Sequence, residues 1–199
     1  MGMVHSSARG GCFDWHMSLE LRPALSHPEL LATPVAVALA EWAAGSRDAG
    51  QVEVAEIDPE LADTVAFCEH YEIPLEKSAN CVVVAGKRRG DTMFAACLIT
   101  AVTRADVNGL VRNRLGARKA SFAPVEETLA ATGMEYGGIT PIGLPPSWPV
   151  LIDPAVIQQP YVIIGSGIRG SKLLVPGPLL GRLPAAEVVD GLGVPASAV

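Results

Sequence analysis

The chain has 199 residues, of which 49% are hydrophobic and 18% are charged, a composition that excludes a disordered protein and fits a single domain. Its formal net charge of -6, taken alone, argues against a nucleic-acid-binding protein. The longest uncharged apolar stretch, residues 30–40, is too short to cross a bilayer, so we expect no membrane association.

The N-terminal residues show neither hydrophobic periodicity nor the apolar core of a signal peptide. We therefore expect an irregular leader over residues 1–25 and one domain over residues 26–199. The four cysteines form no CxxC pair and no disulfide framework, which favours reduced thiols and a cytoplasmic location. These cysteines are Cys12, Cys68, Cys81 and Cys97.

The first part of the domain predicts a helix, a strand and a second helix in turn. Residues 34–44, followed by Gly45, have the composition of a helix with a glycine stop. Residues 52–57 alternate apolar and acidic side chains, as a half-exposed strand does. The sequence Asp-Pro-Glu at 58–60 combines an N-cap residue with a proline at the first helical position, so we expect a helix to begin there.

The second part predicts strands paired by hairpins and separated by helices. Residues 79–85 and 93–101 are apolar runs on either side of a turn at 86–91, which predicts a β-hairpin. The other expected elements are helices at 106–115 (capped by Asp106) and 124–132 (stopped by Gly133), strands at 149–152, 161–165 and 172–175, and a terminal helix from Leu183. Such an order indicates a mixed α/β or α+β fold.

Charge is distributed unevenly along the chain. Residues 1–76 carry three basic and thirteen acidic residues, whereas residues 77–119 carry nine basic and two acidic ones. A basic block of this kind is what a phosphate-contacting surface needs, because each Lys or Arg beside a phosphate releases condensed counterions. A solvated surface, or a basic face docked on the acidic N-terminal half, explains the same charges equally well.

Two familiar site patterns are incomplete. Gly165, Gly167 and Gly170 spell GxGxxG after an expected strand, but a dinucleotide site needs a helix at the third glycine, and another strand is expected there instead. Cys68 and His70 lie two residues apart, but no second His or CxxC completes a zinc site. GxSxG is also absent, so we expect no Ser-His-Asp triad. Because the dinucleotide and zinc patterns are incomplete, we expect no cofactor and no metal.

The sequence GGITPIGLP at residues 137–145 is a candidate backbone-lined site. Its glycines permit positive φ and close approach, and its prolines fix the neighbouring torsions. A loop built in this way can direct successive N–H groups at one point, as an oxyanion or carbonyl site requires. An ordinary surface turn has the same composition.

Residues 132–143 (TGMEYGGITPIG) resemble the signature of the YbaK/EbsC family, the prolyl-tRNA editing-domain superfamily. In that pattern TG is followed by GxxxP, which residues 137–141 supply, and by a further glycine. Downstream, a strand ending in Asp153, the Gly-Ser-Gly of 165–167, and then Arg169 and Lys172 follow in the same order. Residues 115–120 look like the family's LG-x-(K/R)-K-A element, and the similarity covers roughly residues 50–185.

The resemblance implies a central, mostly antiparallel sheet or partial barrel with surrounding helices. It also implies a trans-editing aminoacyl-tRNA deacylase, which hydrolyses the ester between a wrong, small amino acid and tRNA. Water, assisted by the ribose hydroxyl of the substrate, is the attacking group. The expected partner is aminoacyl-tRNA, and an aminoacyl-tRNA synthetase is a candidate second partner.

The resemblance also assigns roles to individual residues. A catalytic role is expected for Asn80, Gly138 and Thr140. Substrate binding is expected for Gly137, Ile139, Pro141, Gly143, Asp153, Gly165, Ser166, Gly167 and Lys172. The basic block then supplies the tRNA-binding residues Lys87, Arg88, Arg89, Arg118 and Lys119.

One position departs from the family pattern. Aligning residues 78–84 places Asn80 where family deacylases carry a lysine that anchors the tRNA end, and an Asn side chain donates hydrogen bonds without a charge. Three alternatives follow. Another cation, such as Lys87 or Lys172, acts in an active deacylase; the chain is a catalytically silent module that binds aminoacyl-tRNA or a small ligand; or a homodimer partner supplies the cation.

Overall fold

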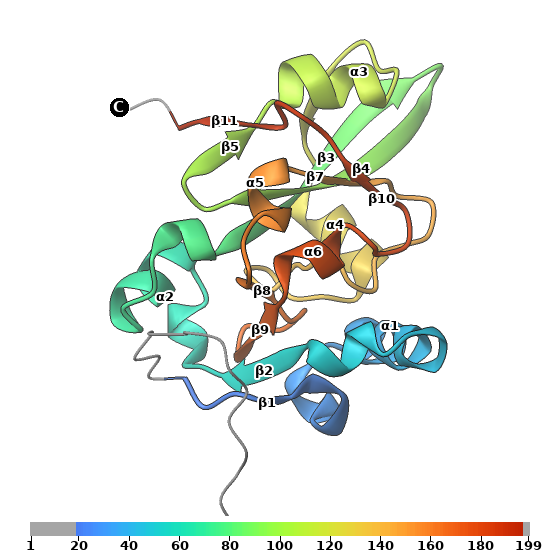
Figure 1. Ribbon diagram of the computed structural model, residues 1–199. Coiled ribbons are helices and arrows are strands. Elements are labelled where there is room, and N and C mark those ends of the chain that lie inside the picture. Colours follow the sequence, from blue (N-terminus) through green and yellow to red (C-terminus); the bar gives the residue numbers. More distant parts are fainter. Residues whose placement is uncertain (1–18, 197–199) are drawn as a thin grey trace, which may run out of the picture.

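The computed structural model describes residues 19–196, and two β-sheets form its framework (Figure 1). The larger sheet has the strand order β10-β7-β4-β3-β6, and the smaller one has the order β1-β2-β9-β8. The strands are β1 (Arg22–Pro23), β2 (Glu53–Glu56), β3 (Ala79–Arg88), β4 (Asp91–Thr100), β5 (Thr103–Ala105), β6 (Ala120–Phe122), β7 (Val150–Ile152), β8 (Val162–Gly165), β9 (Ser171–Val175), β10 (Ala186–Val188) and β11 (Gly193–Pro195). Strands β5 and β11 form a separate two-stranded ribbon.

The helices are short apart from the first. They are α1 (Thr33–Gly45), α2 (Thr64–His70), α3 (Arg112–Arg114), α4 (Val125–Thr132), α5 (Pro154–Ile157) and α6 (Gly177–Leu180), with a π-helical turn at Val107–Val111 and 3-10 turns at Ala24–Ser26, Pro28–Leu30, Asp48–Gln51, Pro59–Leu61 and Leu75–Lys77. Among the described residues, none of the helices has the length and apolar character that a membrane crossing requires.

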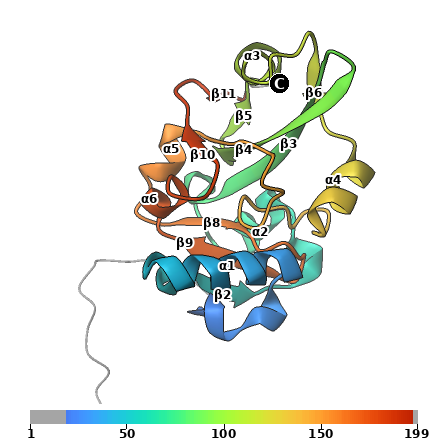
Figure 2. The ribbon, with the colours of Figure 1, turned by 90° about the vertical axis from the view of Figure 1, so that its right-hand side faces the viewer.

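The main hydrophobic core lies between the two sheets and under α1. Val35 and Leu39 of α1 are fully buried there with Leu173 of β9 and with Leu98 and Ile152 of the larger sheet. Figure 2 shows α1 lying along the β2–β9 side of the molecule. These buried aliphatic residues join both sheets into one body, since a sheet must cover its apolar face with another layer.

The sheets approach each other at the start of β3. Ser78, just before this strand, forms an isolated parallel bridge with Ile163 of β8. The β3–β4 hairpin then runs away from this point, and Figure 1 shows its tip projecting from the body of the molecule. One end of β3 therefore lies at the junction of the sheets, and the other lies at a surface extremity.

Most of the expected elements are confirmed. The helix expected at 34–44 is α1, the strand expected at 52–57 is β2, and the expected hairpin is β3–β4. The helix expected at 124–132 is α4, which ends as anticipated at Gly133 with φ +65°. The three short strands expected after residue 149 are β7, β8 and β9, and the mixed α/β class is confirmed.

The helix expected to begin at Asp58 begins instead five residues later. Asp58 accepts a hydrogen bond from Glu60 N and caps a single 3-10 turn. Asp63 is the N-cap of α2, because its carboxylate accepts hydrogen bonds from the backbone N–H groups of Val65 and Ala66. Both aspartates are good N-caps, and the sequence does not reveal that the first helical turn is not continued.

Three further expectations are corrected. The turn expected over 86–91 contains only Arg89 and Gly90, both at positive φ, because the strands continue to the hairpin tip. The helix expected over 106–115 is a π-helical turn followed by α3, although Asp106 does cap it. The terminal helix expected from Leu183 is absent from the described residues, since β10 pairs with β7 and β11 with β5.

The expected leader at 1–25 divides into two parts. Residues 1–18 lie outside the described residues. Residues 19–25 pack on the domain, because Leu19 and Ala24 are buried and β1 pairs with β2.

Candidate functional site

A cavity of about 640 Å³ opens where the two sheets meet. It lies between the start of α2, the start of β3, the loop after α4 and the β8–β9 hairpin. The lining residues are Ala62, Asp63, Thr64, Val65, Ala79, Asn80, Cys81, Val82, Tyr136, Gly137, Ile139, Gly165, Arg169 and Lys172. Five of the expected site residues, from four separate parts of the sequence, thus share one cavity: Asn80, Gly137, Ile139, Gly165 and Lys172.

Lys172 places a buried ammonium group in this cavity. Its side chain is 7% exposed, Nζ donates a hydrogen bond of 2.8 Å to the carbonyl oxygen of Ala62, and Nζ lies 5.5 Å from the ring centroid of Phe67. Burial lowers the pKa of Lys172 to about 8, against which Cys68 and Asp63 raise it, and Arg169 lowers it further. The side chain is therefore cationic at neutral pH and close to its titration range.

Asn80 presents an uncharged donor in the same cavity. Its Oδ1 atom accepts a 2.6 Å hydrogen bond from the hydroxyl of Thr64, at the start of α2. Because the amide oxygen is engaged in this way, the amide NH₂ group is the part of Asn80 that remains to donate to a ligand. The bond from Thr64 thus orients the Asn80 amide so that its NH₂ group, and not its oxygen, is available in the cavity.

Arg169 ties the rim of the cavity together. Its guanidinium donates to the carbonyl oxygens of Pro59 (2.8 Å) and Tyr136 (3.3 Å), and its backbone N–H donates to the Glu135 carboxylate (2.7 Å). These bonds link the 3-10 turn before α2, the loop after α4 and the β8–β9 hairpin. Arg169 therefore holds three walls of the cavity in place.

Glycine at position 165 allows the loop after α4 to lie against β8. A Cβ atom on Gly165 would lie 2.3 Å from the carbonyl oxygen of Gly138 and 2.6 Å from that of Ile139. The loop is also held from the β8–β9 hairpin, where Gly167 N donates to Gly138 O at 2.7 Å. The backbone of the candidate loop is thus fixed against the cavity by direct contact.

The GxGxxG sequence forms the hairpin loop between β8 and β9, as expected from the absence of a helix after it. Ser166 Oγ lies 3.0 Å from the carbonyl oxygen of Ser171, and Ser171 Oγ lies 2.7 Å from Ser166 Oγ. Both side chains are buried. Ser166 and Gly167, which we expected to bind substrate, therefore stabilise the hairpin that carries Arg169 and Lys172.

The remaining expected residues lie outside the cavity. Gly138 is buried against the backbone of Ile168, and the fully buried Thr140 hydroxyl has no hydrogen-bond partner among the described residues. Asp153 accepts from the backbone N–H groups of Ala155 and Gly193 and so joins α5 to β11.

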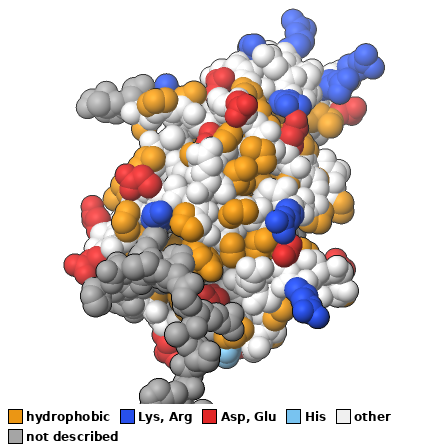
Figure 3. All heavy atoms as spheres, viewed as in Figure 1, with side chains coloured by type: hydrophobic (Ala, Val, Ile, Leu, Met, Phe, Trp, Pro, Cys, Tyr) orange, Lys and Arg blue, Asp and Glu red, His pale blue; other side chains and the backbone are white. Residues whose placement is uncertain are grey.

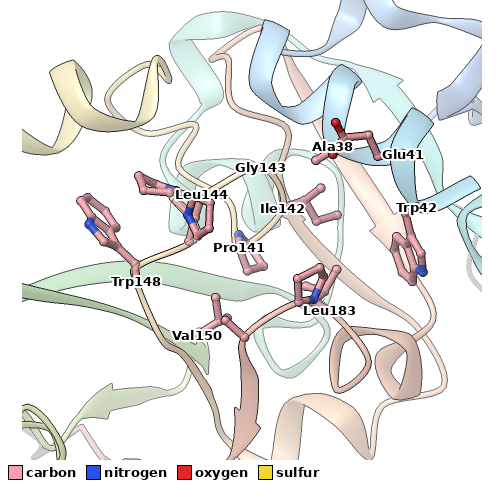
Figure 4. A pocket seen from close by; sticks show the side chains of 14 residues that line it. Ala38, Glu41, Trp42, Pro141, Ile142, Gly143, Leu144, Trp148, Val150 and Leu183 are labelled. Carbon is pink, nitrogen blue, oxygen red and sulfur yellow. The ribbon is translucent and has the colours of Figure 1, made fainter. Parts of the chain in front are cut away.

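Two more of the expected residues, Pro141 and Gly143, line a separate apolar cavity of about 410 Å³ behind the loop. Figure 4 shows this second cavity between the loop, Trp42 of α1 and Trp148. The loop therefore separates the two cavities, and only its first residues, Gly137 and Ile139, belong to the first.

The sequence interpretation missed the contribution of α2. Asp63, Thr64 and Val65 line the cavity from the first turn of this helix. An Asp followed by Thr is an ordinary helix start, so nothing in the local sequence indicated a second role. Cys81 also lines the cavity, but burial raises the pKa of its thiol well above the usual range, so it is a poor nucleophile at neutral pH.

The five expected tRNA-binding residues lie around the β3–β4 hairpin. Lys87, Arg89, Arg118 and Lys119 line a broad hollow of about 970 Å³ beside β6, and Arg88 is exposed on the same hairpin. None of the five forms an ion pair with another described residue. Figure 3 shows Lys and Arg side chains projecting at the upper right, over the hairpin tip. We call these five residues the hairpin cations.

No cluster of three or more His, Cys, Asp or Glu side chains that could hold a metal ion occurs in residues 19–196. The groups that line the cavity include the Lys172 ammonium, the Arg169 guanidinium and the Asn80 amide, together with the Asp63 carboxylate and the backbone of the loop after α4. Such an arrangement can bind and polarise an ester carbonyl, because it places hydrogen-bond donors and positive charge in a partly dehydrated cavity.

Two solved structures have folds similar to that of this chain. The structure of the hypothetical protein APE2540 is similar to this chain with a TM-score of 0.67 and 16% identity, over 79% of this chain and 99% of that one. A proposed trans-editing enzyme for prolyl-tRNA synthetase is similar with a TM-score of 0.63 and 20% identity, over 76% of this chain and 93% of that one. At these identities the two structures show a shared fold. No curated protein sequence matches this chain.

The sequence pattern of the aminoacyl-tRNA editing domain family matches residues 58–183. This range is more than half of the chain, and it contains α2, the candidate loop, the β8–β9 hairpin and every residue that lines the cavity. The resemblance seen in residues 132–143 is thereby confirmed. The chain belongs to the aminoacyl-tRNA editing domain family.

Proposed function

We propose that this protein is a trans-editing deacylase that hydrolyses the ester bond of a tRNA mischarged with a small amino acid. One observation carries the proposal: the Lys172 ammonium and the Asn80 amide line one cavity together with Gly137 and Ile139 of the candidate loop. A cation from the same chain is thus present at the site, although the position expected to carry a lysine is Asn80.

The proposed reaction is hydrolysis, in which water is the second reactant. The oxygen of a water molecule bonds to the ester carbonyl carbon, and the carbonyl oxygen takes up the negative charge of the tetrahedral intermediate. The bond from that carbon to the ribose oxygen then breaks. The proton lost by the water passes to the ribose oxygen, so the products are a free amino acid and a tRNA with its terminal hydroxyl restored.

The walls of the cavity support a small amino acid as the substrate. Val65, Cys81, Val82 and Ile139 present apolar surface around the polar groups. An apolar pocket prefers a substrate over one that lacks a single methylene by only about 10- to 200-fold in kcat/KM. It excludes a substrate with a larger side chain more strongly, because that side chain would clash with the walls. We therefore propose small amino acids as the substrate class of this cavity.

The β3 strand connects the cavity to a surface suited to the tRNA backbone. Asn80 lies near its start, and the hairpin cations Lys87 and Arg88 lie at its end. Lys87 lies seven positions after Asn80 on this strand, which corresponds to about 23 Å at roughly 3.3 Å per residue. The hairpin cations can therefore contact phosphates upstream of a terminal nucleotide that is bound at the cavity.

The hairpin cations are expected to make tRNA binding sensitive to salt. In the triple variant Lys87→Gln, Arg88→Gln, Arg89→Gln, the slope of log K against log salt should decrease by about 2–3, since each lost phosphate contact removes roughly 0.7–0.9. Filter binding or fluorescence titration at several salt concentrations measures the slope. A triple variant of basic residues elsewhere, Arg22→Gln, Arg47→Gln, Arg182→Gln, should keep it, and equal slopes for all three proteins would contradict the assignment.

Filling the cavity tests where the reaction takes place. Val65 is 52% exposed at the start of α2 and lines the cavity, so Val65→Trp should fill the space without disturbing the core. Val37 is also 52% exposed on a helix, but it lies on α1, outside this cavity, and Val37→Trp is the matched control.

The assay is single-turnover hydrolysis of tRNAs mischarged with Ala, Ser, Cys or Pro. We expect the wild type and Val37→Trp to hydrolyse one class of ester at the same rate. The rate for Val65→Trp should be lower by at least about tenfold, because the substrate is no longer held in the orientation that the reaction requires. Hydrolysis by Val65→Trp at the wild-type rate would place the reaction elsewhere. Salt-sensitive tRNA binding without any hydrolysis by the wild type would identify a binding module on the editing fold.

A further inference from the structure

Lys172 is an unusual cation in this fold. Of the lysines and arginines in residues 19–196, it is the one whose side chain is buried. It forms no ion pair with another described residue, and its Nζ atom is held by the Ala62 carbonyl oxygen and the face of Phe67. A charge buried without a carboxylate partner is destabilising, so it calls for an explanation other than stability.

The hydrogen bonds of Lys172 leave capacity for a ligand. An ammonium group carries three N–H donors, and Ala62 accepts from one of them. The ammonium lines the same cavity as Asn80, whose NH₂ group is left to donate because Thr64 occupies its oxygen. The cavity thus contains two side chains that can donate hydrogen bonds to one acceptor.

The other cation that lines the cavity, Arg169, is engaged in hydrogen bonds that hold the fold together. Arg169 donates to two backbone carbonyl oxygens, at Pro59 and Tyr136, and so braces the rim. Arg169 is half-buried, whereas Lys172 is buried. Among the described residues that line the cavity, Lys172 is therefore the cation placed to meet a reacting group.

On the basis of the function proposed above, we propose that Lys172 is a catalytic residue that binds the ester carbonyl oxygen of the substrate and stabilises the oxyanion formed from it. Asn80 donates to the same oxygen. Thr64 is a positioning residue, which acts by holding the Asn80 amide with its NH₂ group toward the cavity. The positive charge of this active site thus comes from β9 and not from β3.

The proposal predicts a large effect of Lys172 on the chemical step. Lys172→Met keeps the length and apolar stem of the side chain and removes the charge, so the single-turnover rate constant should fall by about 10²–10³. The Kd for uncharged tRNA should stay within about twofold, since the hairpin cations supply most of the electrostatic attraction. Lys77→Met is the control, because Lys77 binds Gln159 outside the cavity.

A double variant that moves the lysine from position 172 on β9 to position 80 on β3 provides the decisive comparison. In the double variant Asn80→Lys, Lys172→Met, the cation is supplied from β3, and at least about a tenfold recovery over Lys172→Met is expected. A merely structural role for Lys172 would not allow such a recovery. For the positioning role, Thr64→Val should lower the rate constant and Thr64→Ser should restore it, because serine keeps the hydroxyl.

The experiment uses the full chain and the tRNA that the wild type hydrolyses, with the rate constant and the Kd measured for each variant. Loss of rate in Lys172→Met at unchanged Kd, with recovery in the double variant, supports the proposal. A wild-type rate in Lys172→Met overturns this inference and leaves the deacylase function standing. Absence of hydrolysis by the wild type on every mischarged tRNA overturns both.

Discussion

Replacing Lys172 by Met is expected to make the protein more stable near neutral pH. Burial lowers the pKa of this side chain from 10.5 to about 8. Each pKa unit corresponds to about 1.36 kcal/mol, so the buried ammonium destabilises the folded state by about 3 kcal/mol. In the variant the Ala62 carbonyl loses its hydrogen-bond donor, which lowers the free energy of unfolding by roughly 1 kcal/mol. The net increase expected in the free energy of unfolding is therefore about 2 kcal/mol.

The pH dependence of this gain has a definite sign. The folded-state pKa of Lys172 lies below the unfolded one, so between about pH 8 and pH 10.5 the unfolded chain binds the proton and the folded chain does not. The wild type therefore gains stability relative to Lys172→Met as pH rises through this window. The difference between the two proteins should shrink by about 2 kcal/mol from pH 7 to about pH 9.5.

Denaturant unfolding of both proteins at several pH values measures this difference. Lys77→Met is again the control, because Lys77 lies outside the cavity and donates to Gln159. A variant that is more stable and yet catalytically impaired is the signature of a residue kept for function. A Lys172→Met protein that is less stable than the wild type at pH 7 would contradict the account of a strained, functional charge.

Replacing Gly165 by Ala is expected to cause a large loss of stability. The added Cβ would lie 2.3 Å from the carbonyl oxygen of Gly138, which is a backbone atom and cannot swing aside. Overpacking of this kind typically destabilises by about 1–3 kcal/mol, and we expect the upper end of that range or more. The loop must move away from β8, so the cavity wall and the activity should be lost as well.

Gly50→Ala is the matched control for this substitution. A Cβ at Gly50 meets no atom within 4 Å, and its φ is not in the left-handed region. Its unfolding free energy should stay close to that of the wild type, since Gly to Ala at an unstrained position is neutral or mildly stabilising. Equal unfolding midpoints for both alanine variants would show that the loop is not packed against β8 as described.

Much of the fold follows from local patterns in the sequence. The sequence carries local signals for the apolar strands β3 and β4, for the glycines at the C-terminal ends of α1 and α4, and for the short strands from residue 149 onward. The C-terminal strands β10 and β11 do not, because their partners β7 and β5 lie far away in sequence. Long-range pairing overrides the local helical preference of that segment.

The candidate site was predictable only in part. The loop at residues 137–141 and the β8–β9 hairpin were identified by their glycine pattern, and Gly137, Ile139 and Gly165 line the cavity. The contribution of Thr64 was not predictable, because its bond to Asn80 joins residues 16 apart through the tertiary fold. Gly138 and Ser166 belong to the sequence patterns but do not line the cavity. Gly138 packs against the backbone of Ile168, and Ser166 forms a hydrogen bond within the β8–β9 hairpin.

The burial of Lys172 also depends on the whole fold. The sequence shows a lysine at the start of an apolar strand, which is compatible with an exposed end as well as with a buried one. Its surroundings come from α2 and β9 together, since Ala62 and Phe67 belong to the segment around α2. The position of a charge relative to a cavity is a property of packing, and no local pattern encodes it.

The measurement that tests the central claim most directly is the release of free amino acid from mischarged tRNAs by the wild-type protein near pH 7. Tenfold or greater acceleration over spontaneous hydrolysis, for tRNAs carrying one small amino acid and not for those carrying larger ones, is the result that the proposed function predicts. Release at the spontaneous rate from tRNAs carrying Ala, Ser, Cys and Pro would contradict it, and the cavity would then be a binding site without chemistry.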